Sequence, residues 1–227
     1  MASGLAAEAR RASRQIGVWY DLCRGLARAT ALAWFRSGRR GFRGVPSTGA
    51  LVVVANHASF LDPVLVGVST RRRLHFLARS SLFQFAPFGA LIASLGAIPL
   101  DREGMGRGGL RSAWEVLKGG GAVLLFPEGT RSRDGTLAPL RSGALRLAQR
   151  SGAELLPVWI EGSQRALPRG SWFPRPKRVV VRFGETYRIA PAAPLEGAAM
   201  DLERRLLALR DGGRDRNATA GEPAVGE

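Results

Sequence analysis

Residues 50–62 read ALVVVANHASFLD and place a histidine and a carboxylate directly after an apolar run. Ala50 to Val54 is rich in valine and bounded by polar residues, a pattern that predicts a strand covered on both faces. His57 would then follow the carboxyl end of this strand. Ligands bind at that end in open α/β sheets, so the position favours a catalytic role for His57.

His57 and Asp62 are five positions apart, which on a regular helix would separate their side chains by roughly 140°. The pair can therefore meet only across a bent turn. Pro63 disfavours a helical backbone at Asp62 and so favours such a turn. A carboxylate there would hold one ring nitrogen of His57 and leave the other free as a general base. From this stretch alone, the alternative is a helix-capping Asn or Ser beside an incidental histidine.

Three further blocks follow along the chain. Residues 96–102 read GAIPLDR, residues 126–132 read FPEGTRS and residues 156–158 read LPV. With NHASFLD at 56–62, their order and spacing resemble the four blocks of the glycerolipid acyltransferases, and within them the bacterial 1-acyl-sn-glycerol-3-phosphate acyltransferases. The resemblance covers about residues 50–160 and implies an O-acyltransferase in which His57 and Asp62 are catalytic.

The same resemblance suggests how the substrate is held. Arg102 would contact the acceptor's phosphate, because a guanidinium pairs with phosphate through two parallel hydrogen bonds; a surface salt bridge to Asp101 or Glu103 is the alternative. Glu128 would bind a glycerol hydroxyl or order the arginines, and we favour the second. Pro157 would help to shape the acyl or acceptor pocket, unless it only marks a strand edge. The predicted substrate-binding residues are Asn56, Arg102, Glu128, Gly129, Thr130, Arg131, Ser132 and Pro157.

The loop at residues 128–133 supports a phosphate site on its own composition. It contains two arginines, two hydroxyl side chains and a glycine, which together make a suitable phosphate cradle. Arg133 and the following Asp134-Gly135 are instead expected to form an exposed turn.

Length and charge limit the class of protein. The 227 residues, 45% hydrophobic and 23% charged, fit one globular domain with appendages. The 34 basic and 18 acidic residues give a net charge of +16, which predicts a polyanionic partner: nucleic acid, an anionic membrane surface or a phosphorylated substrate. Nearly all of the basic residues are arginines, a bias that a GC-rich genome also produces. The single cysteine, Cys23, excludes an internal disulfide and a cysteine-built zinc site.

Residues 1–43 are predicted to form a basic, amphipathic helical segment that associates with a membrane. No run approaches the about 20 apolar residues needed to cross a bilayer, and a compact signal-peptide stretch is missing. A basic face opposite aromatic and leucine side chains is typical of a helix lying among headgroups. The alternative is a helix docked on its own domain. The apolar positions at helical spacing are Ile16, Trp19, Leu22, Cys23 and Leu26.

The rest of the chain alternates as an α/β fold should, which predicts a single catalytic domain at 44–210 with a central, mostly parallel sheet flanked by helices. Residues 81–95 are strongly apolar and either line a groove for an acyl chain or form a buried helix. His75 lies in a strand pattern without an acidic neighbour and is interpreted as structural. Residues 211–227 are predicted to be disordered. Strands are predicted at 50–54, 74–78, 96–100, 122–126, 154–160 and 178–183, and helices at 5–35, 63–69, 105–118, 141–150 and 200–209.

These residues predict direct acyl transfer. No serine lies in a G-x-S-x-G elbow and Cys23 is far from the blocks, so a covalent acyl-enzyme lacks its nucleophile. His57 would remove the proton from the free hydroxyl of 1-acyl-sn-glycerol 3-phosphate, and the oxygen would attack the thioester of acyl-coenzyme A or acyl carrier protein to give phosphatidic acid. No metal and no cofactor beyond this co-substrate are expected. An oxyanion hole is required, although the sequence does not identify its donors.

The expected partners are a membrane lipid surface, a lysophospholipid acceptor and the acyl donor, with the protein peripheral or monotopic at the cytoplasmic face of the cell membrane. Nucleic acid is not expected, because no recognition helix or RNA-binding motif is found. Two alternatives stay open. The acceptor could be glycerol 3-phosphate or another lysolipid, or the same histidine could activate water in a lipid or thioester hydrolase.

Overall fold

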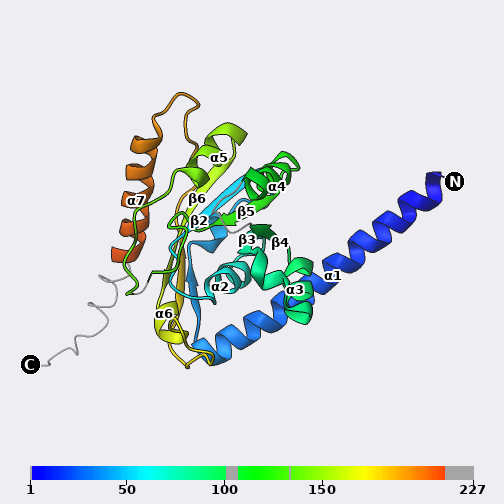
Figure 1. The fold of residues 1–227 in the computed structure, drawn as a ribbon, viewed down its shortest axis with the longest axis horizontal. Helices are drawn as coiled ribbons and strands as arrows, with labels where there is room; N and C mark the ends of the chain where they lie inside the picture. The colour runs from blue at the N-terminus through cyan, green and yellow to red at the C-terminus, as the bar shows by residue number, and fades with distance from the viewer. Residues whose placement is uncertain (1, 101–106, 133, 213–227) are drawn as a thin grey trace, which may run out of the picture.

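A seven-stranded sheet with helices on both faces forms the body of the protein (Figure 1). The computed structural model describes residues 2–100, 107–132 and 134–212. Within them the strand order is β1-β7-β6-β2-β5-β3-β4, and every neighbouring pair is parallel except β6 and β7. The predicted α/β domain with a mostly parallel sheet is confirmed.

Each predicted strand is present with bounds within two residues of the prediction. The strands are β1 (Gly38–Arg40), β2 (Leu51–Ala55), β3 (His75–Arg79), β4 (Ala97–Leu100), β5 (Ala122–Leu125), β6 (Glu154–Glu161) and β7 (Val180–Phe183). The helices are α1 (Ala2–Phe35), α2 (Asp62–Ser69), α3 (Ala86–Ser94), α4 (Arg107–Lys118), α5 (Gly143–Ser151), α6 (Ser163–Ala166) and α7 (Leu195–Asp211), with short 3₁₀ turns η1 (Phe42–Gly44) and η2 (Ser80–Phe83).

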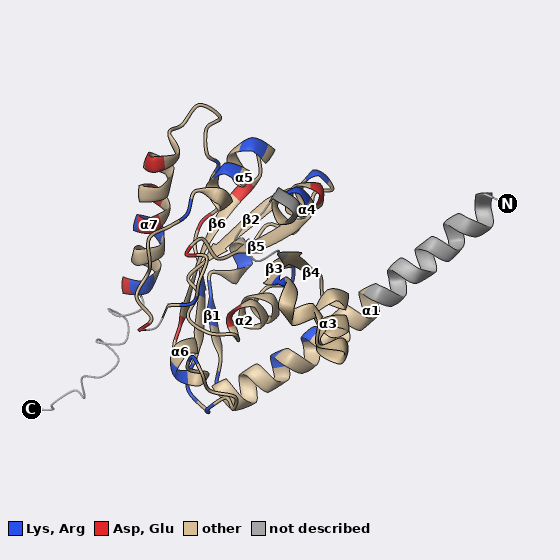
Figure 2. Cartoon of the chain, in the orientation of Figure 1, with Lys and Arg blue, Asp and Glu red and all other residues tan. Residues whose placement is uncertain are grey.

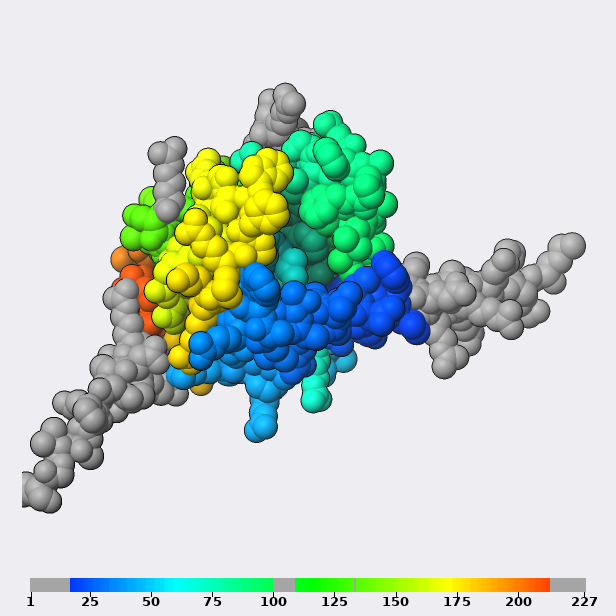
Figure 3. All heavy atoms as spheres, turned by 90° about the horizontal axis from the view of Figure 1, so that it is seen from below, coloured from blue at the N-terminus to red at the C-terminus, as the bar shows by residue number. Residues whose placement is uncertain are grey.

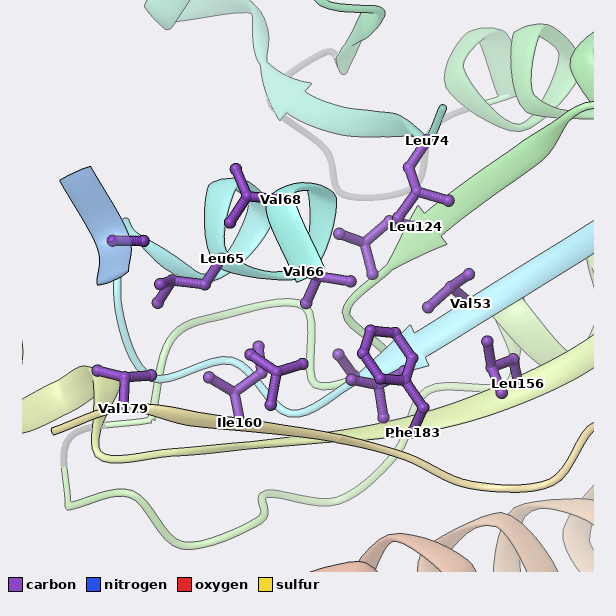
Figure 4. Packing of buried hydrophobic residues seen from close by; sticks show 14 of the residues in the cluster. Val53, Leu65, Val66, Val68, Leu74, Leu124, Leu156, Ile160, Val179 and Phe183 are labelled. Atoms are coloured by element: carbon purple, nitrogen blue, oxygen red, sulfur yellow. The ribbon is translucent and has the colours of Figure 1, made fainter. Parts of the chain in front are cut away.

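Strand β2 lies at the centre because all five of its residues are apolar and buried. It pairs in parallel with β5 on one side and β6 on the other, so both of its edges are hydrogen-bonded. Since side chains alternate along a strand, Val53 packs with α1 and α2 on one face, whereas Val52 and Val54 pack with α4, α5 and α7 on the other. Figure 4 shows the first of these cores, with Val53 beside residues from α2 and from the neighbouring strands.

The sheet includes a strand that the sequence did not indicate. Residues 38–40 lie within the segment 1–43, which was predicted to be helical. Instead, β1 pairs in parallel with β7 and extends the edge of the sheet. Its sequence is Gly-Arg-Arg, so it lacks the apolar alternation that marks a strand, and only tertiary pairing defines it.

Helix α1 is a single helix that both docks and stays open to solvent. Its buried Ala31 and Phe35 belong to the core beside α2. Arg73 holds the helix further along by donating to Gly17 O at 3.0 Å and pairing with Asp21 at 3.1 Å. The alternative of a helix docked on its own domain is therefore correct for one face. Among the described residues, no helix is long and apolar enough to cross a bilayer.

The apolar segment 81–95 forms η2 and α3 at the edge of the molecule, and it is only partly buried. Ile92 is buried, but Phe85, Phe88 and Leu91 are 76%, 46% and 40% exposed. The fully buried helix considered from the sequence is therefore wrong. His75, at the start of β3, is half-buried, and burial lowers the pKa of its imidazole below the ordinary value, in keeping with a structural role.

The expected tail begins inside the last helix. Asp211 is the final residue of α7, and residues 213–227 lie outside the described part of the chain, so their disorder stays a prediction.

Candidate active site

The side chain of Asn56, the residue before His57, joins the end of β2 to β6 by hydrogen bonds. Asn56 is buried, its Nδ2 donates to Ile160 O at 3.0 Å, and its Oδ1 accepts from Ile160 N at 2.7 Å. Because both ends of the amide are engaged by backbone, Asn56 acts here as a positioning residue rather than as the substrate ligand predicted from its place in the motif. The register of Ala55 with Val158 brings the carboxyl ends of β2 and β6 to the same level.

His57 and Asp62 meet as the sequence predicted. The distance from His57 Nδ1 to Asp62 Oδ2 is 2.9 Å, and the same oxygen accepts from the amides of Ala58 and Ser59 at 2.7 Å each. An oxygen that accepts two amide hydrogens acts as an acceptor, so Nδ1 of the ring carries the hydrogen, and in the neutral imidazole Nε2 is the nitrogen with the lone pair. Asp62 is fully buried and cannot shift to another partner without losing these bonds.

The expected conformation of Asp62 was wrong in one respect. Asp62 is the first residue of α2, with Pro63 next to it in the first turn, whereas the sequence argument placed it outside the helical region. A proline is tolerated in a first turn because the amide it lacks would have no partner there. The bend that lets the pair meet instead lies in residues 56–61, between the end of β2 and the start of α2.

Phe126 packs on the face of the His57 imidazole. Its ring stacks on that of His57 with centroids 4.0 Å apart and planes 21° from parallel. Phe126 follows β5, the strand next to β2, so both rings lie at the carboxyl ends of neighbouring strands. The histidine side chain keeps 18% of its surface exposed. Asp62 thus holds the edge of the imidazole at Nδ1 and Phe126 covers one face, while part of the ring stays accessible to a substrate.

Glu128 organises the backbone around His57. It is buried, its Oε1 accepts from His57 N at 2.6 Å, and its Oε2 accepts from Ala138 N at 3.0 Å. No arginine bonds to Glu128 among the described residues, and Arg102 and Arg133 lie outside them, so the expectation that Glu128 orders the arginines stays a prediction. Burial raises the pKa of the Glu128 carboxyl, and the two amide hydrogen bonds oppose that shift. Glu128 therefore fixes the backbone of His57.

The loop after Glu128 passes close to the histidine. Ser132 N donates to His57 O at 2.7 Å, which joins the loop to the end of β2. Gly129 has φ of 72°, and a Cβ there would approach the Arg141 guanidinium to 2.8 Å, so this position requires glycine. Thr130 is exposed, and its hydroxyl stays a predicted ligand.

The predicted exposed turn is present at Asp134-Gly135, where Asp134 is exposed and Gly135 partly so, whereas Arg133 lies outside the described residues. Ser132 Oγ donates to Asp134 Oδ1 at 3.0 Å and accepts from Gly135 N at 2.9 Å, so this hydroxyl stabilises the turn rather than a ligand. Hydrogen bonds from Thr136 and then from Ser132 lower the pKa of Asp134 to about 2.

Arg131 is the basic residue near His57 with a buried donor available to an anion. Its guanidinium lies 3.5 Å above the ring of Phe60, and its Nη1 is buried without a hydrogen-bond partner among the described residues. Burial lowers its pKa, as do the positive charges of Arg169 and Arg79, while Asp62 opposes the shift. A bound anion would offset the repulsion between the positive charges of Arg131, Arg79 and Arg169.

Some predicted residues lie elsewhere. Arg102 is outside the described residues, so its phosphate contact stays a prediction. Pro157 is buried in the interior strand β6, in register with Val54, which excludes the strand-edge alternative. Leu155 N donates towards Tyr187 on the β7 side, and two residues later Pro157 lacks a donor on that same side. A Cβ at Gly184 would lie 2.9 Å from Pro157 Cγ, so Pro157 packs closely against Gly184, the residue that follows β7.

Four site residues were missed from the sequence: Phe60, Arg79, Phe126 and Arg169. Arg79 ends β3, and the rule that ligands bind at the carboxyl ends of strands could have found it. Phe126 opens the FPEGTRS block, but its sequence position says nothing of stacking. Arg169 lies in an irregular loop with no motif. In the described part of the chain, no group of three or more His, Cys, Asp or Glu side chains could hold a metal ion.

The family of this chain follows from comparison with known proteins. The sequence profile of the Acyltransferase family matches residues 39–161, which contain every element that positions His57, and the chain belongs to that family. A crystal structure of the 1-acyl-sn-glycerophosphate acyltransferase PlsC from Thermotoga maritima superimposes with a TM-score of 0.77 at 26% sequence identity, covering 91% of this chain and 83% of that one.

Similar sequences carry a more particular name. A chloroplastic 1-acyl-sn-glycerol-3-phosphate acyltransferase of Brassica napus is 29% identical over 172 residues, or 74% of this chain and 48% of the plant protein. The 1-acyl-sn-glycerol-3-phosphate acyltransferase of Bacillus subtilis is 31% identical over 119 residues, or 52% of this chain and 59% of that one. The chain thus spans about half the length of these curated relatives.

Proposed function

We propose that this protein transfers an acyl group from acyl-coenzyme A or acyl carrier protein to the free hydroxyl of 1-acyl-sn-glycerol 3-phosphate, giving phosphatidic acid. The observation that carries the proposal is the His57–Asp62 pair at the end of β2, with the buried, unpaired Nη1 of Arg131 on the adjoining loop. A base for the hydroxyl and an anion site for the phosphate lie in one region. The names of the relatives agree with this substrate.

The chemistry begins at the free nitrogen of the histidine. Nε2 of His57 accepts the proton of the acceptor hydroxyl, and Asp62 stabilises the imidazolium that forms. The acceptor oxygen attacks the thioester carbonyl, the carbon–sulfur bond breaks, and the proton passes from Nε2 to the leaving thiolate. The clamp of Phe126 and the Glu128 bond to His57 N hold the base in place throughout, which limits the reorganisation that the transition state requires.

Transfer occurs directly rather than through an acyl-enzyme. The hydroxyl nearest to His57 in sequence is that of Ser59, which is fully buried and donates to Leu167 O at 3.0 Å while accepting from Leu61 N at 3.3 Å. An activated serine nucleophile would instead face the free nitrogen of the histidine.

Arg131→Ala is expected to discriminate against the phosphorylated acceptor. The loss of one charge-assisted interaction should cost about 1.5–3 kcal/mol, which is about a 10- to 100-fold fall in kcat/KM for lysophosphatidic acid. The value for monoacylglycerol should barely change, because that acceptor lacks the phosphate. The measurement is kcat/KM for both acceptors in the wild type and the variant.

Arg146→Ala is the matched control, because Arg146 is an exposed arginine on α5, the helix that covers the opposite face of the sheet. It should leave both values close to wild type. Equal losses on the two acceptors in Arg131→Ala would assign this arginine to the donor or to the fold, and the proposed acceptor would then be withdrawn.

The protein is proposed to act on a membrane surface, because exposed apolar side chains surround the approach to the site. Trp19 Nε1 donates to Ser94 Oγ at 3.1 Å, joining α1 to the end of α3, and Trp34 Nε1 donates to Pro174 O at 3.3 Å, joining α1 to the loop after α6. Figure 3 shows a hollow between that loop (yellow) and the η2–α3 segment (green), with α1 (blue) along one side. The exposed apolar residues on the three segments of this rim include Trp172, Phe173, Phe85, Leu26, Val18 and Leu22.

This rim fits an anionic bilayer better than a purely apolar partner. Arg169, Arg175, Lys177 and Arg178 flank the loop tip at Trp172 and Phe173, so basic groups would lie at headgroup level when the aromatic rings enter the interface. We place the protein at the cytoplasmic face, where acyl-coenzyme A and acyl carrier protein are available.

Replacing both Trp172 and Phe173 by serine is expected to weaken binding to vesicles by at least roughly tenfold. The two side chains are 91% and 83% exposed, and burying a large apolar side chain contributes about 1.5–3 kcal/mol. Vesicle co-sedimentation with a mixture of phosphatidylglycerol and phosphatidylcholine measures the change.

Met200→Ser is the control, because Met200 is 72% exposed on α7 and lies outside this rim. Vesicle binding by the double variant at the level of this control would contradict insertion of the loop. Truncation before Gly41 would also remove β1, so point variants test the surface more cleanly than a truncation.

A further inference from the structure

A second group of arginines lies on the outer edge of the sheet, where β1, β7 and β6 meet. Arg40 and Arg182 are in register on neighbouring strands, and Arg182 is also opposite Trp159 of β6. Residues opposite one another share a face of the sheet, so all three side chains lie on the face that carries Trp159, within the core beside α5 and α7. The side chains of α2 pack on the other face.

Arg40 and Arg182 line a small cavity. Its volume is about 100 Å³, and its lining residues are Arg40, Glu161, Arg165, Arg178, Val180 and Arg182. A space of this size can hold a single tetrahedral oxyanion. Figure 2 shows Lys and Arg positions gathered on β1 and α6 in this part of the molecule.

The charges around the cavity do not balance. Four guanidinium groups face one carboxylate, that of Glu161, whose Oε2 is 2.6 Å from Arg182 Nη2. Guanidinium stays protonated in proteins, so the excess positive charge cannot be relieved by loss of a proton. Arg40 and Arg182 are in register on neighbouring strands, and Glu161 is the only carboxylate among the lining residues that opposes their charges.

Hydrogen-bond donors are also left over at this place. Arg182 is only 5% exposed, yet its Nε and Nη1 have no partner among the described residues, and neither does the buried Nη1 of Arg40. Buried polar groups in folded proteins are normally paired. The two arginines that carry these three unpaired donors both line the cavity, and a guanidinium group can bind two phosphoryl oxygens at once.

We propose that this cavity binds a phosphoryl group, at a site separate from the acceptor-phosphate site at Arg131. Arg182 and Arg40 supply the buried donors, and the more exposed Arg165 and Arg178 close the entrance. The phosphoryl group belongs either to a soluble phosphate ester or to a lipid headgroup. Arg178 ends the segment that carries Trp172 and Phe173, so a headgroup could reach the cavity when that loop meets the membrane.

Calorimetric titration with inorganic phosphate, at ionic strength held constant with chloride, tests the site. The full chain is used in an Arg131→Ala background, so that the acceptor site does not contribute. Phosphate should still bind with a stoichiometry near one. Adding Arg165→Ala and Arg178→Ala should weaken this binding at least about tenfold, whereas Arg188→Ala with Arg204→Ala, which removes the same charge from exposed arginines outside the cavity, should not.

Two results would overturn the proposal: loss of all phosphate binding in Arg131→Ala alone, or equal weakening by the two double variants. Arg182→Met adds an independent arm. It removes two unpaired donors but keeps an unbranched side chain, and its melting temperature should become insensitive to phosphate while the wild-type value rises with phosphate. A phosphate-dependent rise in Arg182→Met equal to that of wild type would likewise overturn the proposal.

The source of the phosphoryl group is decided by competition. Displacement of phosphate by vesicles containing phosphatidic acid, but not by phosphatidylcholine vesicles, would assign the site to lipid headgroups. Displacement by coenzyme A at concentrations where pantetheine has no effect would assign it to a soluble ester. Neither readout depends on acyl transfer, so the cavity and the proposed function can fail independently.

Discussion

Replacing His57 by alanine is expected to lower kcat for acyl transfer by about 10²–10⁴-fold, the usual contribution of a positioned general base. The physical reason is the geometry of the ring, whose Nδ1 is committed to Asp62 and whose Nε2 is left as the proton acceptor. The fold should survive, because the backbone of residue 57 keeps its bonds to Glu128 and to Ser132 N. Steady-state kinetics with thermal unfolding as a parallel readout measures both effects.

His75→Gln is the matched control, since His75 is the only other histidine and is half-buried in β3. It should retain kcat close to wild type. If His57→Ala turns over as fast as this control, His57 is not the base.

Replacing Asp62 by asparagine is expected to have the second-largest effect. The amide oxygen of asparagine can still accept from Ala58 and Ser59, but the negative charge that stabilises the imidazolium is removed. In the serine proteases the same change beside the histidine costs ~10⁴ in kcat. We expect a loss of about 10²–10⁴-fold here with little change in the melting temperature.

Asp62→Ala separates the structural from the catalytic part of this role. It leaves two buried amides without an acceptor, and each unsatisfied group costs about 1–3 kcal/mol. This variant should therefore lose stability as well as activity, whereas Asp62→Asn should lose activity alone. A kcat for Asp62→Asn close to wild type would mean that the carboxylate serves only the turn.

The contact between His57 and Asp62 could be predicted because its signals are local. A valine-rich run predicts β2, and His57 follows it within two residues. The conformation of Asp62 was predicted less well, because Pro63 is compatible both with a helix start and with an extended residue before it. The turn across residues 56–61 brings the side chains of His57 and Asp62 together in either case. The predicted contact was therefore right, although the predicted start of the helix was not.

The supporting residues could not be predicted, because their partners are distant in sequence. Glu128 bonds to the backbone of His57, 71 positions away, and Asn56 bonds to Ile160, 104 positions away. Nothing in either residue type distinguishes a substrate ligand from a backbone acceptor. β1 was missed for a related reason, since three residues of Gly-Arg-Arg become a strand only when β7 supplies the pairing.

The exposed apolar residues in and just before α3 show what a hydrophobic pattern in the sequence cannot predict. An apolar run predicts that side chains avoid water, but it does not say whether protein or lipid covers them. In the structure Phe85 is 76% exposed although its segment is among the most apolar in the chain. The loop at Trp172 and Phe173 shows no periodic pattern at all, and only the fold brings it to the same rim.

The most direct test of the account is the product formed by purified protein from lysophosphatidic acid and an acyl thioester. The account predicts phosphatidic acid and free thiol in equal amounts, loss of both in His57→Ala, and no thiol release when lysophosphatidic acid is omitted. Mass spectrometry of the lipids with a thiol assay measures all three. Free fatty acid released at the wild-type rate without any acceptor would contradict the account and identify the histidine as the base of a hydrolase.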